Sequence, residues 1–174
     1  MPQMLDPNFS GTLTYICEHT EEGAMGIIIN SPLSIGLHDI LKQLDLPIKG
    51  PSQTIYWGGP VQEDRGFILH SDDAPAGNQW ESTMRLTDGL HLTTSRDIIG
   101  AIADQKGPHH YLFALGYAGW GDGQLEYELA ENTWLCCPAT QEILFHPDVA
   151  MKRKLAISSL GITEHQLNAQ IGHA

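Results

Sequence analysis

The sequence predicts an α+β fold in which a mixed sheet is combined with several helices. Two observations favour this class. Strand-like and helix-like segments are interleaved without the strict rhythm of a doubly wound parallel sheet. The first two strand-like segments are joined by a short turn, as in an antiparallel hairpin. A chain of 174 residues can bury one core, so we expect a single domain over residues 1–174.

The N-terminal half is expected to form four strands and one helix. The strands are predicted at residues 12–17, 24–30, 54–57 and 66–70. A short segment that ends in Gly23 joins the first two into a hairpin, and Pro32 ends the second. The helix has one apolar face with the spacing i, i+3, i+4, i+7, made by Leu37, Ile40, Leu41 and Leu44. Polar residues 71–82 are expected to form a surface loop.

The C-terminal half is expected to alternate strands and helices. Strands are predicted at residues 90–94, 109–115 and 133–137, and helices after Ser95, over 124–132 and over 148–160. Ser95 is the predicted N-cap of the first of these helices. The buried face of that helix is expected to consist of Ile98, Ile99, Ile102 and Ala103. Gly161 suits the C′ position of the last helix.

The segment from Gly116 to Gly123 has the most distinctive composition, because four of its eight residues are glycine. Such density favours a backbone shape that side chains forbid. A strand, then glycines, then a helix N-terminus can bind an anion. The spacing G-x-x-G-x-G-x-G, however, lacks the Walker A lysine and differs from a Rossmann fingerprint, and Asp122 and Glu126 would repel an anion. Two interpretations stay open: a ligand-binding loop, or a structural turn with Trp120 packed into the core.

Two other corners resemble this one, at Asn30-Ser31-Pro32 and at Gly58-Gly59-Pro60. If the strand ends gather at one edge, the three corners could line one cleft. The alternative is three ordinary turns. The candidate ligand-binding residues are Asn30, Pro32, Gly58, Gly59, Pro60, Tyr117, Gly119, Trp120, Gly121 and Gly123.

Local motifs for metal binding and nucleophilic catalysis are absent from the sequence. None of the nine histidines falls into a known ligand spacing, so we expect no metal and no cofactor. There is no G-x-S-x-G elbow, and we assign no catalytic residue. The sequence has three cysteines, Cys17, Cys136 and Cys137, an odd number that matches no zinc spacing and fits a reducing cytosol. A structural or incidental role is predicted for them, and redox sensing is the alternative.

The charge of the chain argues against direct nucleic-acid binding. The formal net charge is −12, from 21 acidic and 9 basic residues, whereas nucleic-acid binding rests on Lys and Arg contacts to phosphates. The one basic cluster, Lys152-Arg153-Lys154, is interpreted as the solvated face of a C-terminal helix. No apolar run has the length of a membrane helix, and the start of the chain does not resemble a signal peptide, so we expect a cytoplasmic protein without membrane contact.

Several separate segments together resemble the AlgH/YqgE family, in the same order and over nearly the whole chain. They are residues 5–9, 15–19, 22–32, 58–61, 95–97, 114–121 and 172–174. The resemblance implies a largely antiparallel, barrel-like sheet flanked by helices in a bacterial cytosolic protein. It also implies that many relatives carry a further apolar segment ahead of the position of Met1. It implies no established activity; the family carries a transcriptional-regulator label from an association with alginate production.

The sequence therefore favours a non-enzymatic binding or regulatory module with a small-molecule or protein partner. Its candidate site is the cleft formed by the glycine segment and the two other corners. The alternatives are a small-molecule enzyme that uses the same cleft and a transcriptional regulator, direct or indirect.

Overall fold

A computed structural model describes residues 9–75, 77, 79–87, 89–163 and 166 of the chain. The strands are β1 (Thr14–Thr20), β2 (Gly23–Ile28), β3 (Pro32–Gly36), β4 (Thr54–Trp57), β5 (Val61–Ser71), β6 (Thr83–Arg85), β7 (Leu90–Thr93) and β8 (Tyr111–Trp120). The helices are α1 (Leu37–Gln43), α2 (Asp97–Ala103), α3 (Gln124–Ala130), α4 (Gln141–Phe145) and α5 (Val149–Ser159).

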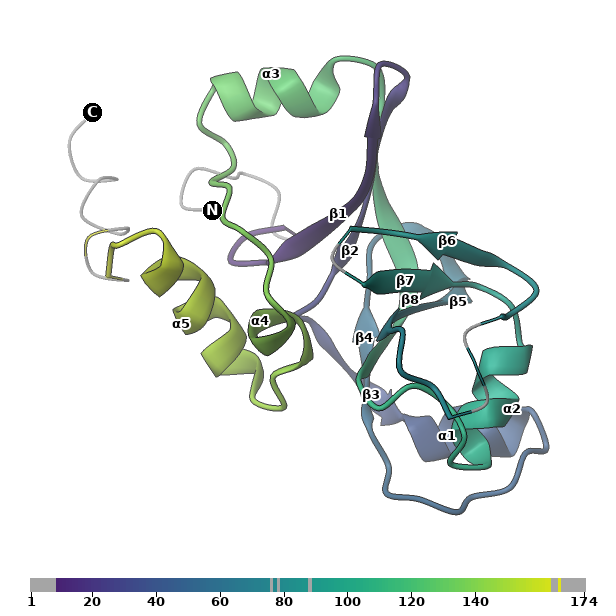
Figure 1. Cartoon of the computed structure of the whole chain (residues 1–174). Helices are drawn as coiled ribbons and strands as arrows, with labels where there is room; N and C mark the ends of the chain where they lie inside the picture. The colour runs from purple at the N-terminus through teal and green to yellow at the C-terminus, as the bar shows by residue number, and fades with distance from the viewer. Residues whose placement is uncertain (1–8, 76, 78, 88, 164–165, 167–174) are drawn as a thin grey trace.

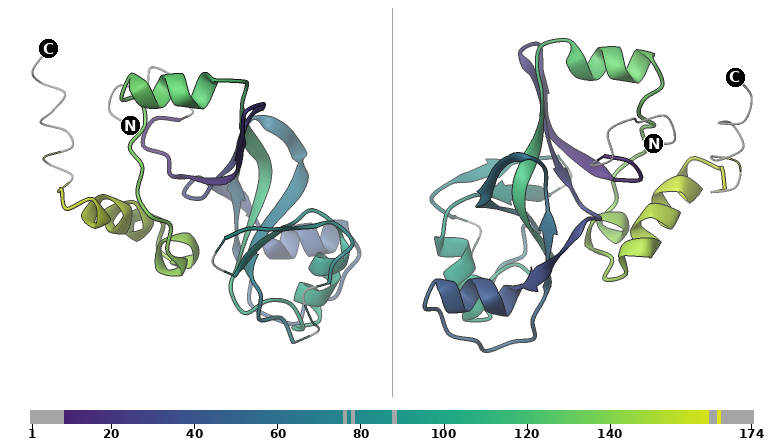
Figure 2. Two further views of the ribbon diagram at one scale, coloured as in Figure 1. Left: turned by 45° about the horizontal axis from the view of Figure 1, so that its top comes forward. Right: turned by 180° about the vertical axis from the view of Figure 1, so that it is seen from behind.

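The strands form one curled sheet that is largely antiparallel. Its main path runs β1-β2-β8-β5-β7-β6, and β4 joins it as a parallel neighbour of β8 while pairing with β3. The sheet curls into a half barrel, with α1 and α2 at one end and α4 and α5 at the other (Figure 1, Figure 2). The predicted fold class, an α+β protein with a barrel-like mixed sheet and flanking helices, is confirmed.

The central strand of the sheet is β8, and its partner changes halfway along one side. Residues 113–115 pair with β4, whereas residues 118–120 pair with β2. Gly58 lies at the change: its N–H donates to the Leu115 carbonyl at 2.7 Å, and its own carbonyl accepts from the Ile28 N–H at 2.9 Å. The other side of β8 pairs with β5. The backbone of Gly58 therefore connects β2, β4 and β8.

This junction requires glycine because three backbone segments meet without space for side chains. A Cβ on Gly58 would lie 2.2 Å from the Gly116 carbonyl oxygen, and one on Gly116 would lie 2.3 Å from the Gly59 carbonyl oxygen. A Cβ on Gly59 would lie 2.1 Å from the carbonyl carbon of Tyr117. Gly59 and Gly116 also have φ angles of +148° and +76°, which disfavour any L side chain. We refer to Gly58, Gly59 and Gly116 as the glycine junction.

The two faces of β8 belong to different parts of the core, because successive side chains of a strand point in opposite directions. Leu112 and Ala114 lie in the core that α4 and α5 cover, whereas Phe113 lies in the core that α1 and α2 cover. The predicted buried face of α2 is confirmed in full, since Ile98, Ile99, Ile102 and Ala103 are all buried. Leu37 and Leu41 are the buried residues of α1.

Several predicted boundaries were wrong. Residues 133–137 lie outside any strand: they cross between α3 and α4, and residues 134–137 border a cavity instead of pairing with a strand. Ser95 is not an N-cap: α2 begins at Asp97, and the Ser95 hydroxyl donates to the Asp97 carboxylate at 2.5 Å. The strand predicted at 109–115 continues through the glycines to Trp120. The sequence interpretation also missed β3, β6 and α4.

The glycine junction should be far more sensitive to substitution than the rest of the glycine-rich segment. Gly116→Ala should lower the free energy of unfolding by roughly 3 kcal/mol or more, because the new Cβ overlaps the Gly59 carbonyl and φ is positive. Gly119→Ala is the matched control: its Cβ would meet nothing closer than Tyr117 Cε2 at 3.5 Å, so it should cost less than about 1 kcal/mol. Urea denaturation measures both, and equal losses would contradict this account.

Candidate functional site

The ten residues predicted to form a glycine cleft are distributed over several elements of the structure. Five of them lie at the glycine junction or along β8, namely Gly58, Gly59, Tyr117, Gly119 and Trp120. Pro60 is exposed, and Pro32 begins β3 opposite Tyr56. Asn30 holds the preceding chain, since its side chain accepts from the Leu13 N–H and donates to the Gly11 carbonyl. Gly121 and Gly123 precede α3, where Gly123 is the N-cap with a φ of +67°.

Trp120 is the one residue of these ten that borders a large cavity. The cavity has a volume of about 400 Å³, and we refer to it as the β1 cavity. One wall is residues 12–16 and His19, in and beside β1, and the floor includes Ile29. The opposite wall is formed by α3, the segment 134–139, α4 and α5. Figure 2 shows these elements around the β1 side of the sheet, away from α1 and α2.

Two tryptophans are fixed at the border of the β1 cavity by one carboxylate. Glu128 Oε2 accepts hydrogen bonds from Trp120 Nε1 at 2.9 Å and from Trp134 Nε1 at 2.8 Å. Gln124 Nε2 donates to the other oxygen of Glu128 at 3.0 Å. The two indole rings meet edge to face, with centroids 5.9 Å apart. Aromatic surface at the cavity is therefore held in a fixed orientation before any ligand arrives.

The basic cluster at residues 152–154 has three different environments, so its interpretation as one solvated face was wrong. Lys152 is 1% exposed and lies against the sheet. Arg153 is half-buried and borders the β1 cavity. Lys154 alone is exposed. Residues next to each other on a helix point about 100° apart, which places the three on three faces of α5.

Lys152 connects α5 to the sheet through a buried ammonium group. Its Nζ donates to the Ile29 carbonyl at 2.9 Å and lies 4.3 Å from the centroid of the Tyr56 ring. These contacts replace only part of the lost hydration. Burial consequently lowers the pKa of Lys152 from 10.5 to about 8.

The pKa of Lys152 predicts that stability rises with pH above neutrality. Between about pH 8 and pH 10.5 the unfolded chain holds more protons than the folded one, so the free energy of unfolding increases with pH. Burial raises the pKa of Cys17 and Tyr111 to about 12, which opposes the trend at higher pH. We therefore compare wild type with Lys152→Met from pH 7.5 to 9: wild type should gain about 1 kcal/mol relative to the variant. Lys154→Met should retain the wild-type slope, and a slope unchanged by Lys152→Met would contradict the prediction.

The three cysteines are thiols rather than disulfides in the described chain. Cys136 is exposed, Cys137 is half-buried, and both border the β1 cavity. Burial is the main cause of the high pKa of Cys17, which keeps that thiol protonated and therefore weakly nucleophilic at neutral pH. The structural or incidental role predicted for Cys136 and Cys137 stays a prediction.

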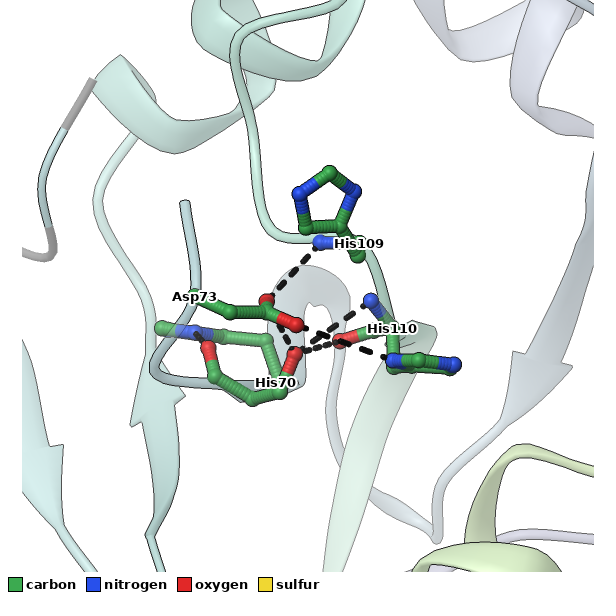
Figure 3. Close-up of polar contacts among 5 residues, drawn as sticks. His70, Asp73, His109 and His110 are labelled. Carbon is green, nitrogen blue, oxygen red and sulfur yellow. Dashed lines mark hydrogen bonds and ion pairs between the residues drawn. The ribbon is translucent and has the colours of Figure 1, made fainter. Parts of the chain in front are cut away.

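A second polar cluster lies where the loop after β5 meets the start of β8 (Figure 3). Asp73 Oδ1 accepts from the Ser71 hydroxyl at 2.5 Å and from the His109 N–H at 3.0 Å, and His110 Nδ1 lies 3.8 Å from Asp73 Oδ2. Burial acts to raise the pKa of Asp73, but these hydrogen bonds outweigh it and lower the pKa overall. The Ser71 hydroxyl thus donates directly to a carboxylate, which is not the serine–histidine–aspartate relay of a hydrolase. We interpret the cluster as a clamp between β5 and β8.

Two buried histidines lie next to this clamp on β5 and β7. The ring nitrogens of His70 contact the Ser71 carbonyl and the Thr93 hydroxyl, each at 2.8 Å. The His91 ring lies 5.5 Å from that of His70, and its Nδ1 is buried with no hydrogen-bond partner among the described residues. Burial lowers the pKa of His70, so its neutral form is favoured in the folded chain.

Acid should therefore destabilise the fold partly through His70. Its ordinary pKa of 6.5 applies in the unfolded chain, so the stabilisation is present above pH 6.5 and is lost as the pH falls towards the lower folded value. Between pH 7 and pH 5, wild type should lose more unfolding free energy than His70→Gln. Met84→Gln, which changes an exposed side chain of β6 without altering a titratable group, should behave like wild type. Urea denaturation at each pH measures this, and parallel curves for all three proteins would contradict it.

Among the residues described, no three His, Cys, Asp or Glu side chains are grouped so that they could hold a metal ion. Within the same residues, no helix is both long and apolar enough to cross a membrane. A smaller cavity of about 230 Å³ lies between α1, α2 and Tyr111 of β8.

The curled antiparallel sheet with helices at both ends defines the class, an α+β half-barrel protein. A family model described as AlgH-like matches residues 1–165, and the chain belongs to this family. It is 49% identical over 174 residues to a UPF0301 protein of Hahella chejuensis, and 51% identical over 178 residues to one of Pseudomonas putida strain GB-1. Each match covers 100% of this chain and 92% of the relative.

Two solved structures share the fold. The solution structure of the AlgH protein from Pseudomonas aeruginosa has a TM-score of 0.76 and 47% identity, and the match covers 100% of this chain and 92% of that one. A crystal structure of a protein from Corynebacterium diphtheriae has a TM-score of 0.70 over 90% of this chain and 81% of that one. Its identity of 20% makes it a likeness of fold alone. The family resemblance inferred from the sequence is thereby confirmed.

Sequence interpretation missed most of the β1 cavity, although one signal was present. Arg153, Ala156, Ile157 and Leu160 border the cavity and follow the spacing i, i+3, i+4, i+7. That pattern identifies a helix face, but it does not reveal that the facing surface leaves a space. Trp134 and the segment that follows it were assigned to a strand, which concealed their role as a wall.

Proposed function

We propose that this protein is a binding module for a small, largely apolar molecule held in the β1 cavity. The observation that carries the proposal is the cavity itself: about 400 Å³ lined mainly by aliphatic and aromatic side chains. This volume lies in the range of small-molecule sites, which combine apolar walls with a few polar groups. Trp120 and Trp134 add rigid aromatic surface at its border.

The proposed site retains one of the residues first inferred from the sequence. Trp120 borders the β1 cavity, whereas the glycines at 58, 59 and 116 serve backbone packing. A ligand role for the remaining nine candidates stays a prediction. We also retain the proposal that the protein works in the cytoplasm. A regulatory role is retained as well, because a protein that binds a small molecule can affect gene regulation without contacting DNA.

An enzyme that uses the same cavity is the second candidate. Cys136, Cys137 and His19 border the cavity and could take part in chemistry. His19 Nε2, however, lies 2.5 Å from Glu126 Oε1, so the contact occupies one of its ring nitrogens. Direct DNA binding has less support, because the formal charge is −12 and the basic cluster is divided between the core, the cavity and solvent.

Displacement of the neutral fluorophore N-phenyl-1-naphthylamine by straight-chain alcohols would test the proposal. Burial of each added CH2 contributes about 0.8 kcal/mol, so affinity should rise about fourfold per carbon until the cavity is full and then level off. Ala139→Trp places a bulky ring at an exposed position of the cavity wall and should weaken binding at least about tenfold.

Ala130→Trp is the matched control, because Ala130 is also exposed but does not border the cavity. Its affinities should equal those of wild type. Absence of displacement, affinity that is independent of chain length, or equal losses in both variants would contradict a binding site in the β1 cavity.

A further inference from the structure

The face of α5 that borders the β1 cavity carries a charge at one end of an apolar stripe. Ala156, Ile157 and Leu160 contribute aliphatic surface, and Arg153 stands one turn before them on the same face. The positions on either side of Arg153 do not share this face, since Lys152 is buried against the sheet and Lys154 is exposed. The cavity therefore has an apolar length and a cationic end along a single helix.

The charge balance of the cavity wall is opposite to that of the whole chain. The chain has 21 acidic and 9 basic residues, yet the described residues that border the cavity include no Asp or Glu, and Arg153 is the one Lys or Arg among them. The negative net charge of the whole chain, −12, disfavours the binding of anions in general. For an anion that carries a long apolar group, the burial of that group offsets the unfavourable electrostatic free energy of binding.

The β1 wall offers a further polar group. Thr14 borders the cavity, and its hydroxyl oxygen is buried with no hydrogen-bond partner among the described residues. A buried hydroxyl without a partner is costly, and a rotation of the Thr14 side chain towards the cavity would let a ligand oxygen satisfy it. Arginine presents five N–H donors in a planar fork that matches the two oxygens of a carboxylate, so it can serve a ligand together with other partners.

We propose that the ligand of the β1 cavity is a long-chain aliphatic carboxylic acid, whose chain lies against the apolar walls and whose carboxylate binds Arg153. This inference rests on the proposed function and adds the chemical class of the ligand. The binding involves no covalent step. The bidentate contact with Arg153 selects the acid over a neutral or cationic molecule with the same chain.

A comparison of three ligands with the same chain length tests the carboxylate inference separately from the proposed function. Dodecanoate, methyl dodecanoate and dodecylammonium are titrated below their critical micelle concentrations by displacement of the same neutral fluorophore. Wild type should bind dodecanoate at least about tenfold more tightly than the methyl ester, and dodecylammonium most weakly. Arg153→Gln should reduce the affinity for dodecanoate to that for the ester and leave the ester unchanged.

Lys154→Gln removes a neighbouring charge outside the cavity and should change neither affinity. Arg153→Lys keeps the charge but loses the planar fork, so its preference for the acid over the ester should be intermediate. This variant replaces Arg153→Gln in the experiment if Arg153→Gln does not fold. Equal affinity of wild type for acid and ester would overturn the carboxylate inference and leave the binding module intact. Equal loss of both ligands in Arg153→Gln would also overturn it, because Arg153 would then support the wall. Absence of binding by all three ligands would overturn the proposed function as well.

Discussion

The close contact of backbones at the glycine junction is the constraint on which the rest of the fold depends. Strand β8 has to pair with β4 and then with β2 along one side, and Gly58 provides the hydrogen bonds to both neighbours at the change. A side chain at Gly58, Gly59 or Gly116 would separate these backbones and break the junction. The curl of the sheet, and so the direction in which the β1–β2 hairpin leaves β8, follows from a contact that only glycine permits.

That direction determines where a cavity can form. The hairpin carries β1 away from the main body of the sheet, so the sheet cannot cover both sides of β1 by itself. Helices α4 and α5 complete the enclosure from the opposite side, and the 134–139 segment closes the gap between them and α3. Lys152 fixes α5 to the Ile29 carbonyl, next to the end of β2. Both walls of the cavity are therefore attached to the same part of the sheet.

Local patterns in the sequence predicted most of the elements but not their meeting points. The hairpin, the buried face of α2 and the final helix were predictable, because periodicity and turn residues are encoded within a few neighbouring positions. The glycines were recognised as special, but the reason was missed: their neighbours are carbonyl groups more than 50 residues away, which no local pattern shows. The 133–137 segment resembled a strand because apolar residues that line a cavity and apolar residues of a buried strand have the same composition.

The same limit explains the basic cluster at the start of α5. Three adjacent cations suggest one solvated patch, but a helix turns each residue by about 100°, and α5 lies between the core, the cavity and solvent. Burial of the charged Lys152 ammonium group in the core costs free energy, and its lowered pKa reflects this cost. This cost has a structural consequence, since a buried ammonium group with one carbonyl acceptor and one ring fixes the rotation of α5 about its axis. Once that rotation is fixed, Arg153 has to face the β1 cavity, and a charged group at the end of an apolar wall follows from the position of its buried neighbour.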